Sequence, residues 1–424
     1  MKIAIIGSGI AGNVAAYHLH REHDITVFEA GAHIGGHTHT HCVEHEGCRV
    51  SVDTGFIVFN ERTYPRFMQL LRELDVGWQP SDMSFSVKCL ASGLEYNGTS
   101  LNRLFAQRRN LLRPSFWRMI ADIVRFNREA PAVLSATEGR LPLRDYLENG
   151  GYSDDFIARY IVPMGAAIWS CGTQSLLDFP TDFFVRFFHN HGMLSVDDRP
   201  QWLTIRGGSA RYVEKLVAPF RDRILTRARV ERVRRTPQGV QVCVAGADPL
   251  RFDRVFFACH SDQVLEVLAD VTPAEYATLA AIRYTRNEAL LHTDTSVLPR
   301  RTLARAAWNY RIDGRAAERV AVTYDMKLLQ RLPVRTPLLV SLNMGGDIDP
   351  RKVIERVEYA HPVYTRESVA AQARQVQING ANRAYFCGAY WGHGFHEDGV
   401  VSALQALEHF RQREYAQLAL PRSA

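Results

Sequence analysis

A glycine-rich turn between two apolar strands opens the chain and restricts its fold more than any other feature. Lys2–Ile6 has the pattern of a short strand, and it runs into Gly7-Ser8-Gly9-Ile10-Ala11-Gly12. An apolar helix pattern follows, and a second strand at Ile25–Phe28 ends on Glu29. This succession of strand, turn, helix, strand and acid is typical of a dinucleotide-binding unit.

Each position of the turn has a physical role in such a unit. Gly7 permits the tight turn, Gly9 lets the backbone approach a pyrophosphate, and Gly12 lets the helix pack closely on the strand. Ile10 and Ala11 begin the helix, whose N-terminus offers free N–H groups and a partial positive charge to phosphates. We therefore predict that this turn holds the phosphates of a dinucleotide.

The residues after the second strand distinguish FAD from NAD. Glu29 is expected to accept hydrogen bonds from the adenosine ribose, and an acid there argues against a 2′-phosphate. The chain then reaches a second glycine pair, which lets it fold back over the pyrophosphate from the other side. The predicted cofactor contacts in this second loop are Ala30, Gly35, Gly36, His37 and Thr38.

With that glycine pair, the chain resembles the superfamily of FAD-dependent amine oxidases and phytoene desaturases. Three later segments resemble the same superfamily in the same order. Val52–Phe56 is similar to the stretch beside the isoalloxazine ring. Arg206–Ser209, with the strand around Val230, is similar to the clamp on the adenine end. Tyr385–Tyr390, followed by Glu397–Gly399 and a helix, resembles the C-terminal flavin motif.

This resemblance implies non-covalent FAD in an α/β fold, with a glutathione-reductase-like Rossmann domain and a discontinuous α+β substrate domain. The last helix, expected at Val400–Phe410, would point its N-terminus at the flavin pyrimidine edge, where its dipole stabilises negative charge. Cys387 is a poor fit to a covalent flavin attachment. The cofactor contacts implied by these segments are Thr54, Gly55, Phe56, Val230, Gly388, Ala389, Glu397, Asp398, Gly399 and Val400.

The same resemblance implies two discontinuous domains. The FAD-binding domain is expected to comprise residues 1–80, 201–275 and 375–424, and the substrate domain residues 81–200 and 276–374. Residues 101–200 are predicted to be mostly helical, after a hairpin that begins near Ser84. Alternating segments predict an antiparallel sheet beneath the substrate. These segments are Ala289–His292, Trp308–Ile312, Val320–Tyr324 and Leu338–Asn343.

Composition limits the class of protein and its surroundings. The 424 residues are 46% hydrophobic and 23% charged, as in ordinary soluble globular proteins, and the apolar runs are too short to span a bilayer. The seven cysteines form no CxxC pair, and the first residues carry no basic leader, so we expect reduced thiols in the cytoplasm. The net charge of +6 is too mild to predict nucleic-acid binding.

One stretch leaves two interpretations open. Leu101–Ala130 mixes many arginines with leucine, phenylalanine and Trp117. An amphipathic helix of this kind can lie in a lipid headgroup layer, which would place the protein at the inner membrane face. It can equally be a packed helix of the substrate domain with a solvated basic face.

Candidate catalytic residues come from the C-terminal motif and from the predicted sheet. Tyr390 and Trp391 follow the C-terminal glycine, where amine oxidases place an aromatic beside the flavin. His393 and the neighbouring His396 are expected to contact flavin or substrate. The remaining catalytic candidates, on predicted strands and equally interpretable as core residues, are Tyr310 and Tyr324.

Two absences shape the functional hypothesis. An amine oxidase would usually add a lysine near the flavin, yet the expected strand at Tyr284–His292 has none. Lys327, in a neighbouring segment, stays open as a candidate for this role. The alternating histidines His37, His39 and His41 overlap the presumed pyrophosphate loop, and no carboxylate or cysteine completes a ligand set, so no metal is predicted.

The substrate hypothesis rests on a narrower resemblance. Tyr324-Asp-Met, Tyr359–Pro362 and Gly388–Gly399 are similar to a bacterial subgroup often encoded beside cyclopropane-fatty-acyl-phospholipid synthases. This association implies a fatty acyl chain or its phospholipid as substrate, with hydride transfer to flavin N5, and a lipid-modifying enzyme as candidate partner. The alternatives are a redox-neutral fatty-acid double-bond isomerase, an amine oxidase, and a non-catalytic flavoprotein partner of a lipid methyltransferase.

Overall fold

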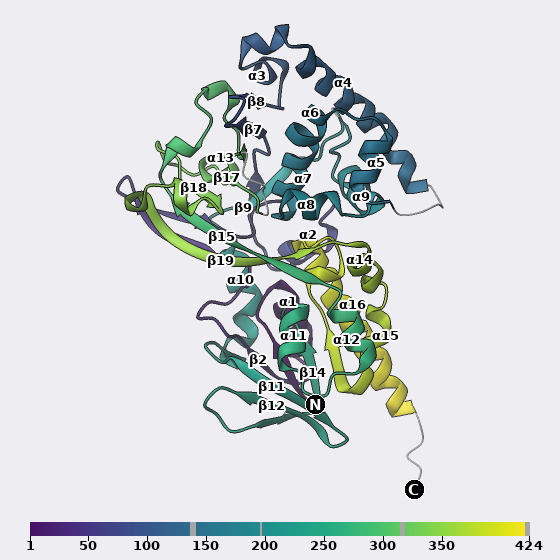
Figure 1. Cartoon of the computed structure of the whole chain (residues 1–424). Helices are drawn as coiled ribbons and strands as arrows, with labels where there is room; N and C mark the ends of the chain where they lie inside the picture. Colours follow the sequence, from purple (N-terminus) through teal and green to yellow (C-terminus); the bar gives the residue numbers. More distant parts are fainter. Residues whose placement is uncertain (136–140, 196, 314–318, 420–424) are drawn as a thin grey trace.

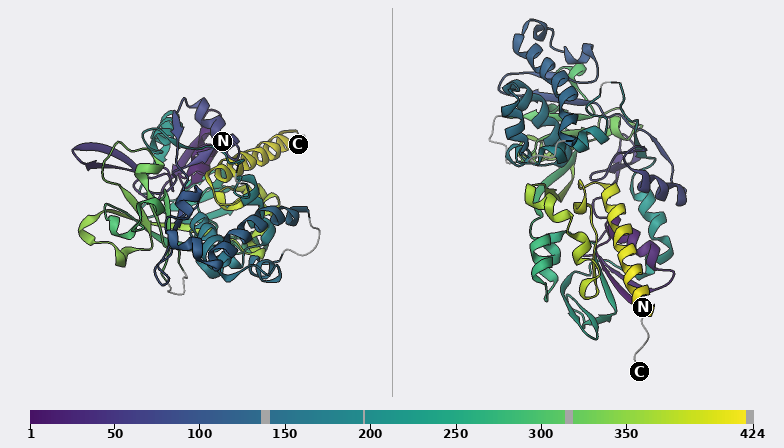
Figure 2. Two further views of the ribbon diagram at one scale, coloured as in Figure 1. Left: turned by 90° about the horizontal axis from the view of Figure 1, so that it is seen from above. Right: turned by 90° about the vertical axis from the view of Figure 1, so that its right-hand side faces the viewer.

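The computed structural model describes residues 1–135, 141–195, 197–313 and 319–419. It has a mixed α/β fold built around a five-stranded sheet and a seven-stranded sheet. Figure 1 shows the five-stranded sheet at the lower end of an elongated molecule and the helices of residues 101–190 at the upper end. The right-hand view of Figure 2 shows the same separation.

All neighbouring strands of the five-stranded sheet are parallel. Ile3 and Ile5 of its central strand pack into one apolar cluster and Ala4 and Ile6 into another, so the strand is buried on both faces. Strands that are buried on both faces have nearly continuous apolar sequences, so the first two strands of the chain could be predicted from the sequence. In spatial order the strands are β10 (Ile224–Leu225), β2 (Asp24–Phe28), β1 (Lys2–Ile6), β14 (Arg254–Phe257) and β20 (Ala384–Phe386).

Helices cover one face of this sheet, and a three-stranded antiparallel sheet, with further helices beside it, packs on the other. The first group is α1 (Ile10–Leu19), α2 (Pro65–Glu73), α10 (Ala210–Val217) and α16 (His396–Ala419). The second includes β11 (Val230–Thr236), β12 (Gly239–Val244), β13 (Leu250–Phe252) and α11 (Ser261–Val267). The predicted helix start at Val400 is wrong: α16 begins at His396, because acidic side chains are favourable in a first turn.

The seven-stranded sheet contains the predicted alternating segments and the predicted hairpin. Its neighbours pair antiparallel, except for a parallel pair between β16 and β7. The long edge strand β19 was not predicted. In order the strands are β19 (Val353–Val363), β15 (Arg283–His292), β18 (Leu339–Leu342), β17 (Val322–Asp325), β16 (Trp308–Ile312), β7 (Phe85–Cys89) and β8 (Glu95–Asn97).

The predicted helical region is confirmed and packs around aromatic side chains, including Phe126, Phe156, Phe179, Phe184 and Phe188. No helix among the described residues is long and apolar enough to cross a membrane. The helices of this region are α3 (Leu101–Leu104), α4 (Pro114–Glu129), α5 (Leu143–Asn149), α6 (Asp154–Phe156), α7 (Val162–Trp169), α8 (Thr173–Leu177) and α9 (Thr181–Asn190).

Shorter elements complete the described chain. A hairpin of β3 (Thr40–His45) and β4 (Cys48–Asp53) follows the second glycine loop, and β5 (Phe59–Asn60), β9 (Trp202–Ile205) and β6 (Trp78–Pro80) form a small antiparallel sheet. The remaining helices are α12 (Pro273–Leu279), α13 (Met326–Leu329), α14 (Arg366–Gln372) and α15 (Gln375–Ile378).

Candidate active site

The two glycine loops predicted to enclose a pyrophosphate lie against each other. The Gly35 amide donates to the Ser8 carbonyl at 3.0 Å. A Cβ on Gly36, which has a φ of 59°, would lie only 3.0 Å from the Gly9 Cα. The chain therefore folds back over the first loop as the sequence indicates, and only glycine permits this close approach.

The start of α1 is open to an anion. Gly9 is its N-cap, no side chain caps the helix, and its first turn holds no acidic residue. A Cβ on Gly9 would meet nothing within 4 Å, whereas one on Gly12 would collide with the Gly7 carbonyl. Ile10 and Ala11, the first helical residues, are buried behind this space. Free amides facing open space are what a phosphate group requires.

Glu29 lies at the predicted adenosine end of the site. Its Oε2 accepts hydrogen bonds from the Ser8 amide at 3.0 Å and the Ser8 hydroxyl at 2.6 Å, and its Oε1 accepts from the Gly31 amide at 2.7 Å. The Ala228 amide donates to the Glu29 carbonyl at 2.9 Å, two residues before β11 begins at Val230. Ala30 is exposed beside them. The structure thus brings Glu29 and the Val230 segment together.

Asp53 joins two of the family-like segments. Its buried carboxylate accepts from the Ser209 amide at 3.0 Å, the Ser209 hydroxyl at 2.7 Å and Gln330 Nε2 at 2.8 Å. The Thr40 hydroxyl also donates to it. Burial raises the pKa of this carboxyl to about 6. Sequence reasoning missed this role, although an acid between apolar strand residues was the available signal.

The residues after Asp53 run along the second glycine loop. The Phe56 amide donates to the His37 carbonyl at 2.8 Å, and a Cβ on Gly55 would collide with that carbonyl. The Thr54 hydroxyl lies 2.7 Å from the Tyr359 hydroxyl on β19. This contact ties the loop to the edge of the seven-stranded sheet.

His396, the first residue of α16, brings several predicted segments to one point. Its ring stacks on Phe56 with centroids 3.6 Å apart and planes 8° apart. Its Nε2 lies 2.7 Å from the Tyr212 hydroxyl and 3.0 Å from the Thr38 hydroxyl. Burial holds the pKa of His396 well below its usual value, so the ring is neutral. Tyr212 is a contact that the sequence did not reveal.

The start of α16 also touches the first glycine loop. A Cβ on Gly399 would lie 2.6 Å from Ile10 Cγ2, and Val400 is buried in the same apolar cluster as Ile10. The Gly388 amide donates to the Ser402 hydroxyl of α16 at 2.9 Å, and Ala389 begins the short turn that follows. The C-terminal motif therefore closes on the dinucleotide loop, as predicted.

Neutral imidazoles surround the second glycine loop. The His37 ring lies 5.1 Å from Tyr359 and 5.3 Å from His361, measured between centroids. Burial lowers the pKa of His37 to about 4 and that of His361 to about 3. Within the described ranges, no group of three or more His, Cys, Asp or Glu side chains is arranged to hold a metal ion.

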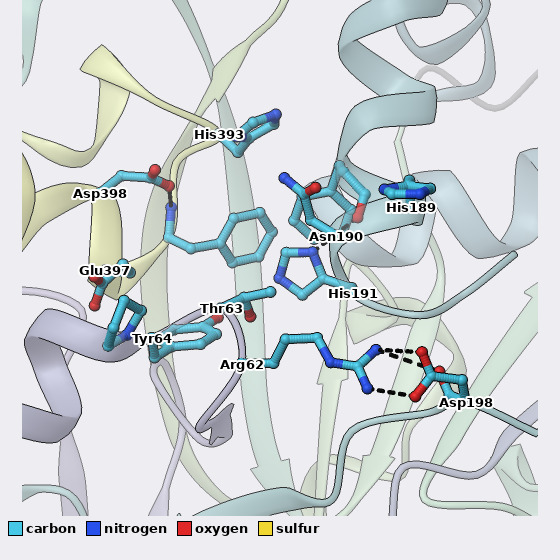
Figure 3. A pocket seen from close by; sticks show the side chains of 13 residues that line it. Arg62, Thr63, Tyr64, His189, Asn190, His191, Asp198, His393, Glu397 and Asp398 are labelled. Atoms are coloured by element: carbon cyan, nitrogen blue, oxygen red, sulfur yellow. Dashed lines mark hydrogen bonds and ion pairs between the residues drawn. The ribbon is translucent and has the colours of Figure 1, made fainter. Parts of the chain in front are cut away.

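A cavity of about 830 Å³ opens beside the C-terminal motif. Its walls come from the start of α2, the end of α9 and the segment that enters α16, as Figure 3 shows. Phe187, Phe395 and Tyr64 supply aromatic surface. The polar residues on its lining include Arg62, His189, Asn190, His191, Asp198, His393, Glu397 and Asp398.

Arg62 presents its guanidinium to a carboxylate at the rim of the cavity. Its Nη2 lies 2.6 Å from Asp198 Oδ1 and its Nη1 lies 3.2 Å from Asp198 Oδ2 (Figure 3). The Asp198 side chain is 76% exposed, so this pair is open to exchange with solutes. A forked pair of this kind matches planar carboxylates and phosphates.

Two histidines of the cavity, His191 and His393, are neutral and rest on aromatic rings. His191 stacks on Phe187 at 3.8 Å, and His393 stacks on Phe183 at 4.4 Å. Burial lowers the pKa of His191 and of His393 to about 4. The His393 Nε2 atom is buried without a hydrogen-bond partner among the described residues.

The two acids of the motif have structural partners. Glu397 accepts from the Arg66 and Phe67 amides at 2.9 and 2.8 Å, so it caps the start of α2. Asp398 accepts from the Phe395 amide at 2.9 Å, and burial raises its pKa to about 7.

Of the five predicted catalytic candidates, only His393 lines the cavity. Tyr390 and Trp391 pack in the apolar cluster beneath the parallel sheet, and neither the Tyr390 hydroxyl nor Trp391 Nε1 has a partner among the described residues. Tyr310 and Tyr324 are buried on β16 and β17 in the cluster around the helical region. The structure therefore does not bring these four tyrosine and tryptophan side chains to the cavity.

Lysine is absent from the cavity lining. Lys327, left open by the sequence, donates to the Arg335 carbonyl at 2.7 Å at an exposed position. Lys88 is turned toward the Val297 and Leu298 carbonyls instead. Neither side chain lines the cavity.

The uncapped helix start, the open space at Gly9 and the acid at Glu29 fit an FAD molecule. A family model described as flavin containing amine oxidoreductase matches residues 10–292. The chain belongs to this family. It is an FAD-dependent oxidoreductase. A search of curated proteins found no match.

Several solved structures share its fold. Cyclohexylamine oxidase from Brevibacterium oxydans IH-35A is 15% identical, with a TM-score of 0.70 over 97% of this chain and 99% of that chain. A fatty acid isomerase from P. acnes that produces CLA is 14% identical, with a TM-score of 0.67 over 96% and 98%. Putrescine oxidase bound to putrescine is 14% identical, with a TM-score of 0.66 over 97% and 99%.

Proposed function

We propose that this oxidoreductase acts on a fatty acyl chain, either free or within a phospholipid. The observation that carries the proposal is the cavity beside the C-terminal motif, which combines aromatic walls with an arginine at its rim. Its volume of about 830 Å³ lies within the roughly 300–1,000 Å³ usual for small-molecule sites.

In this proposal, a glutathione-reductase-like Rossmann domain formed by residues 1–80, 201–275 and 375–424 holds FAD without a covalent bond. The parallel strands β1, β2, β10, β14 and β20 all come from these segments. The amides at the start of α1 hold the phosphates, and Glu29 binds the adenosine ribose. The bound flavin supplies a two-electron acceptor for the substrate.

Arg62 is assigned to the substrate head group. Arg62 binds the Asp198 carboxylate in a bidentate manner, and a substrate carboxylate or phosphate can replace Asp198 in this pair. Phe187 and Phe395 would then line the path of the acyl chain. Arg62 lines the cavity and Lys327 and Lys88 do not, which supports an anionic acyl substrate over an amine.

His393 is the best-placed residue for proton handling. Its ring is neutral and packed against Phe183, and its Nε2 has no partner within the described part of the chain. A neutral nitrogen without a hydrogen-bond partner can accept a proton from a bound substrate that reaches it. We assign His393 this role and treat Tyr310, Tyr324, Tyr390 and Trp391 as structural.

The test is anaerobic mixing of the purified yellow protein with unsaturated and cyclopropane fatty acids and phospholipids, and in parallel with cyclohexylamine and putrescine. Loss of the flavin band near ~450 nm with a desaturated or oxygenated lipid product supports the proposal. Bleaching by amines alone would replace it with amine oxidation.

Two further outcomes separate the remaining alternatives. Bleaching that recovers without oxygen and leaves a shifted double bond identifies a redox-neutral isomerase, the activity named for the structurally similar protein from P. acnes. Tight flavin binding with no bleaching by any substrate, together with co-purification of a lipid methyltransferase, identifies a non-catalytic partner subunit.

A further inference from the structure

Apolar side chains stand exposed on the helices at the upper end of the molecule in Figure 1. Leu112 is 88% exposed and Leu101 75% exposed, and both Trp117 and Leu111 are nearly half exposed. These residues belong to α3, to the short 3-10 helix Arg108–Leu112 and to the start of α4. We call this set of four residues, with the arginines described next, the α3–α4 surface.

Five arginines lie in the same stretch of chain as these apolar side chains, without any acid among them. No Asp or Glu occurs in the sequence between Glu95 and Asp122. Arg108 and Arg109 are directed at backbone carbonyls, of Phe105 at 2.9 Å and Gly93 at 3.2 Å. Within the described ranges, no carboxylate forms an ion pair with any of the five arginines of this surface. They are Arg103, Arg108, Arg109, Arg113 and Arg118.

The surface rests on a fixed support. The opposite side of α4 buries Phe116, Met119 and Phe126 in the core of the helical region. Trp117 donates its Nε1 hydrogen to the Leu111 carbonyl at 2.9 Å and packs on Phe105 at 5.2 Å. Trp117 is therefore held outward by a packed helix, and its contacts join this helix to the segments that contain Leu111 and Phe105.

We propose that the α3–α4 surface docks this protein on an anionic lipid bilayer. The arginines would bind lipid phosphates, Trp117 would lie at the headgroup level, and Leu101 and Leu112 would enter the acyl boundary. A nucleic acid would use the positive charge but would gain nothing from burying leucines. Charge and apolar exposure together therefore select a membrane surface rather than a nucleic acid, and the docking is independent of which substrate the cavity takes.

Sedimentation of the flavin-loaded protein with vesicles tests the proposal. One set is phosphatidylcholine alone, and the other contains about a quarter phosphatidylglycerol. We expect binding to the anionic vesicles to be roughly tenfold tighter and to weaken as salt is added. Absence of binding to anionic vesicles at low salt overturns the proposal. Equal competition by duplex DNA assigns the surface to polyanions in general and also overturns it.

Matched variants locate the contact. Leu101→Ser/Leu112→Ser and Arg113→Gln/Arg118→Gln are each expected to weaken vesicle binding about tenfold. The controls at the opposite end of the molecule are Leu250→Ser and Arg232→Gln/Arg234→Gln, on β13 and β11, and they should bind like the parent protein. If the controls lose as much binding as the test variants, the surface is not the contact. Flavin content and circular dichroism report that each variant is folded.

Trp117 supplies a second readout, because it is the only tryptophan among the described residues in the exposed class. Lipids brominated on their acyl chains should quench tryptophan fluorescence of the parent protein, and Trp117→Phe should abolish most of that quenching. Unchanged quenching in this variant would show that another part of the molecule meets the lipid. Since this experiment involves no turnover, it can fail while the proposed acyl chemistry stands, and the reverse also holds.

Discussion

The predicted cofactor site and the cavity beside it are made of different parts of the polypeptide. The cofactor site is lined largely by backbone, through the amides at the start of α1 and two close glycine loops. The cavity is lined by side chains from α2, α9 and the segment before α16. A site lined by backbone depends on glycines at a few positions, and these positions lie close together in the sequence. A site made of side chains depends on which distant segments meet.

The largest effect should come from Gly9→Ala at the backbone-built site. The new Cβ meets nothing within 4 Å and the Gly9 φ of −68° suits alanine, so the protein should fold normally. It should nevertheless bind flavin at least ~100-fold more weakly, because the methyl group occupies the space predicted for the pyrophosphate. Flavin content by absorbance, with melting temperature of the flavin-free protein, measures both quantities.

Gly12→Ala is the matched comparison. Its Cβ would collide with the Gly7 carbonyl, so this variant should lose stability as well as flavin. A Gly9→Ala protein that keeps its flavin would show that the phosphates lie elsewhere.

The next largest effect, on stability, is expected at Asp53, whose side chain joins several segments around the predicted cofactor site. Asp53→Asn replaces one accepting carboxylate oxygen with an NH₂ group, which donates. The neighbouring groups of Ser209, Thr40 and Gln330 also donate, so at least one of them loses its acceptor. The free energy of unfolding should fall by about 2–3 kcal/mol, since buried donors lose their acceptor. Urea denaturation measures the change. Ser402→Ala, which removes the acceptor of the Gly388 amide, should cost less because fewer hydrogen bonds are lost.

At the cavity, Arg62→Gln should raise KM for an anionic lipid about tenfold while kcat changes little, because the head group loses its charged partner. Asp198→Asn should act in the opposite direction and lower KM, since it frees the guanidinium. Steady-state kinetics with the lipid that reduces the flavin gives both values. If the two variants change KM in the same direction, the head group does not bind at Arg62.

A further effect is a pH dependence that involves Asp398. Burial raises its folded pKa from 3.8 to about 7, so the folded state holds a proton that the unfolded state releases. This preference stabilises the fold fully below about pH 4 and is lost as the pH rises through about 7. Relative to Asp398→Asn, the parent protein should therefore lose about 1.4 kcal/mol per pH unit across this window, which is roughly 4 kcal/mol in all. Urea denaturation at pH 4, 5, 6 and 7 tests it, and a constant difference would contradict it.

The sequence indicated that the two glycine loops meet because the residues that determine this contact are local. Gly9, Glu29 and Gly36 lie within one strand-helix-strand unit, and their contacts follow from the spacing alone. Arg62 and His191 gave no such signal, since nothing in the sequence near either residue indicates that α2 and α9 meet at the same cavity. His393 was predicted only because it sits inside a family-like motif.

The strand β19 was missed for a related reason. Its sequence alternates charged and apolar residues and contains Pro362, which argues against a strand in the middle of a sheet. The structure places β19 at the edge of the sheet, paired with β15 alone, where proline and exposed charges are tolerated. Edge position is a property of the assembled sheet and cannot be read from one segment.

The cap that Glu397 places on α2 has a mechanical consequence. Residue 397 belongs to the helix that closes on the dinucleotide loop, and its carboxylate grips the Arg66 and Phe67 amides next to the cavity wall at Tyr64. The Glu397 carboxylate thus joins the helix beside the predicted cofactor site directly to the helix at the cavity wall. We therefore expect cofactor binding to set the position of this cavity wall, so that the cofactor binds before the substrate.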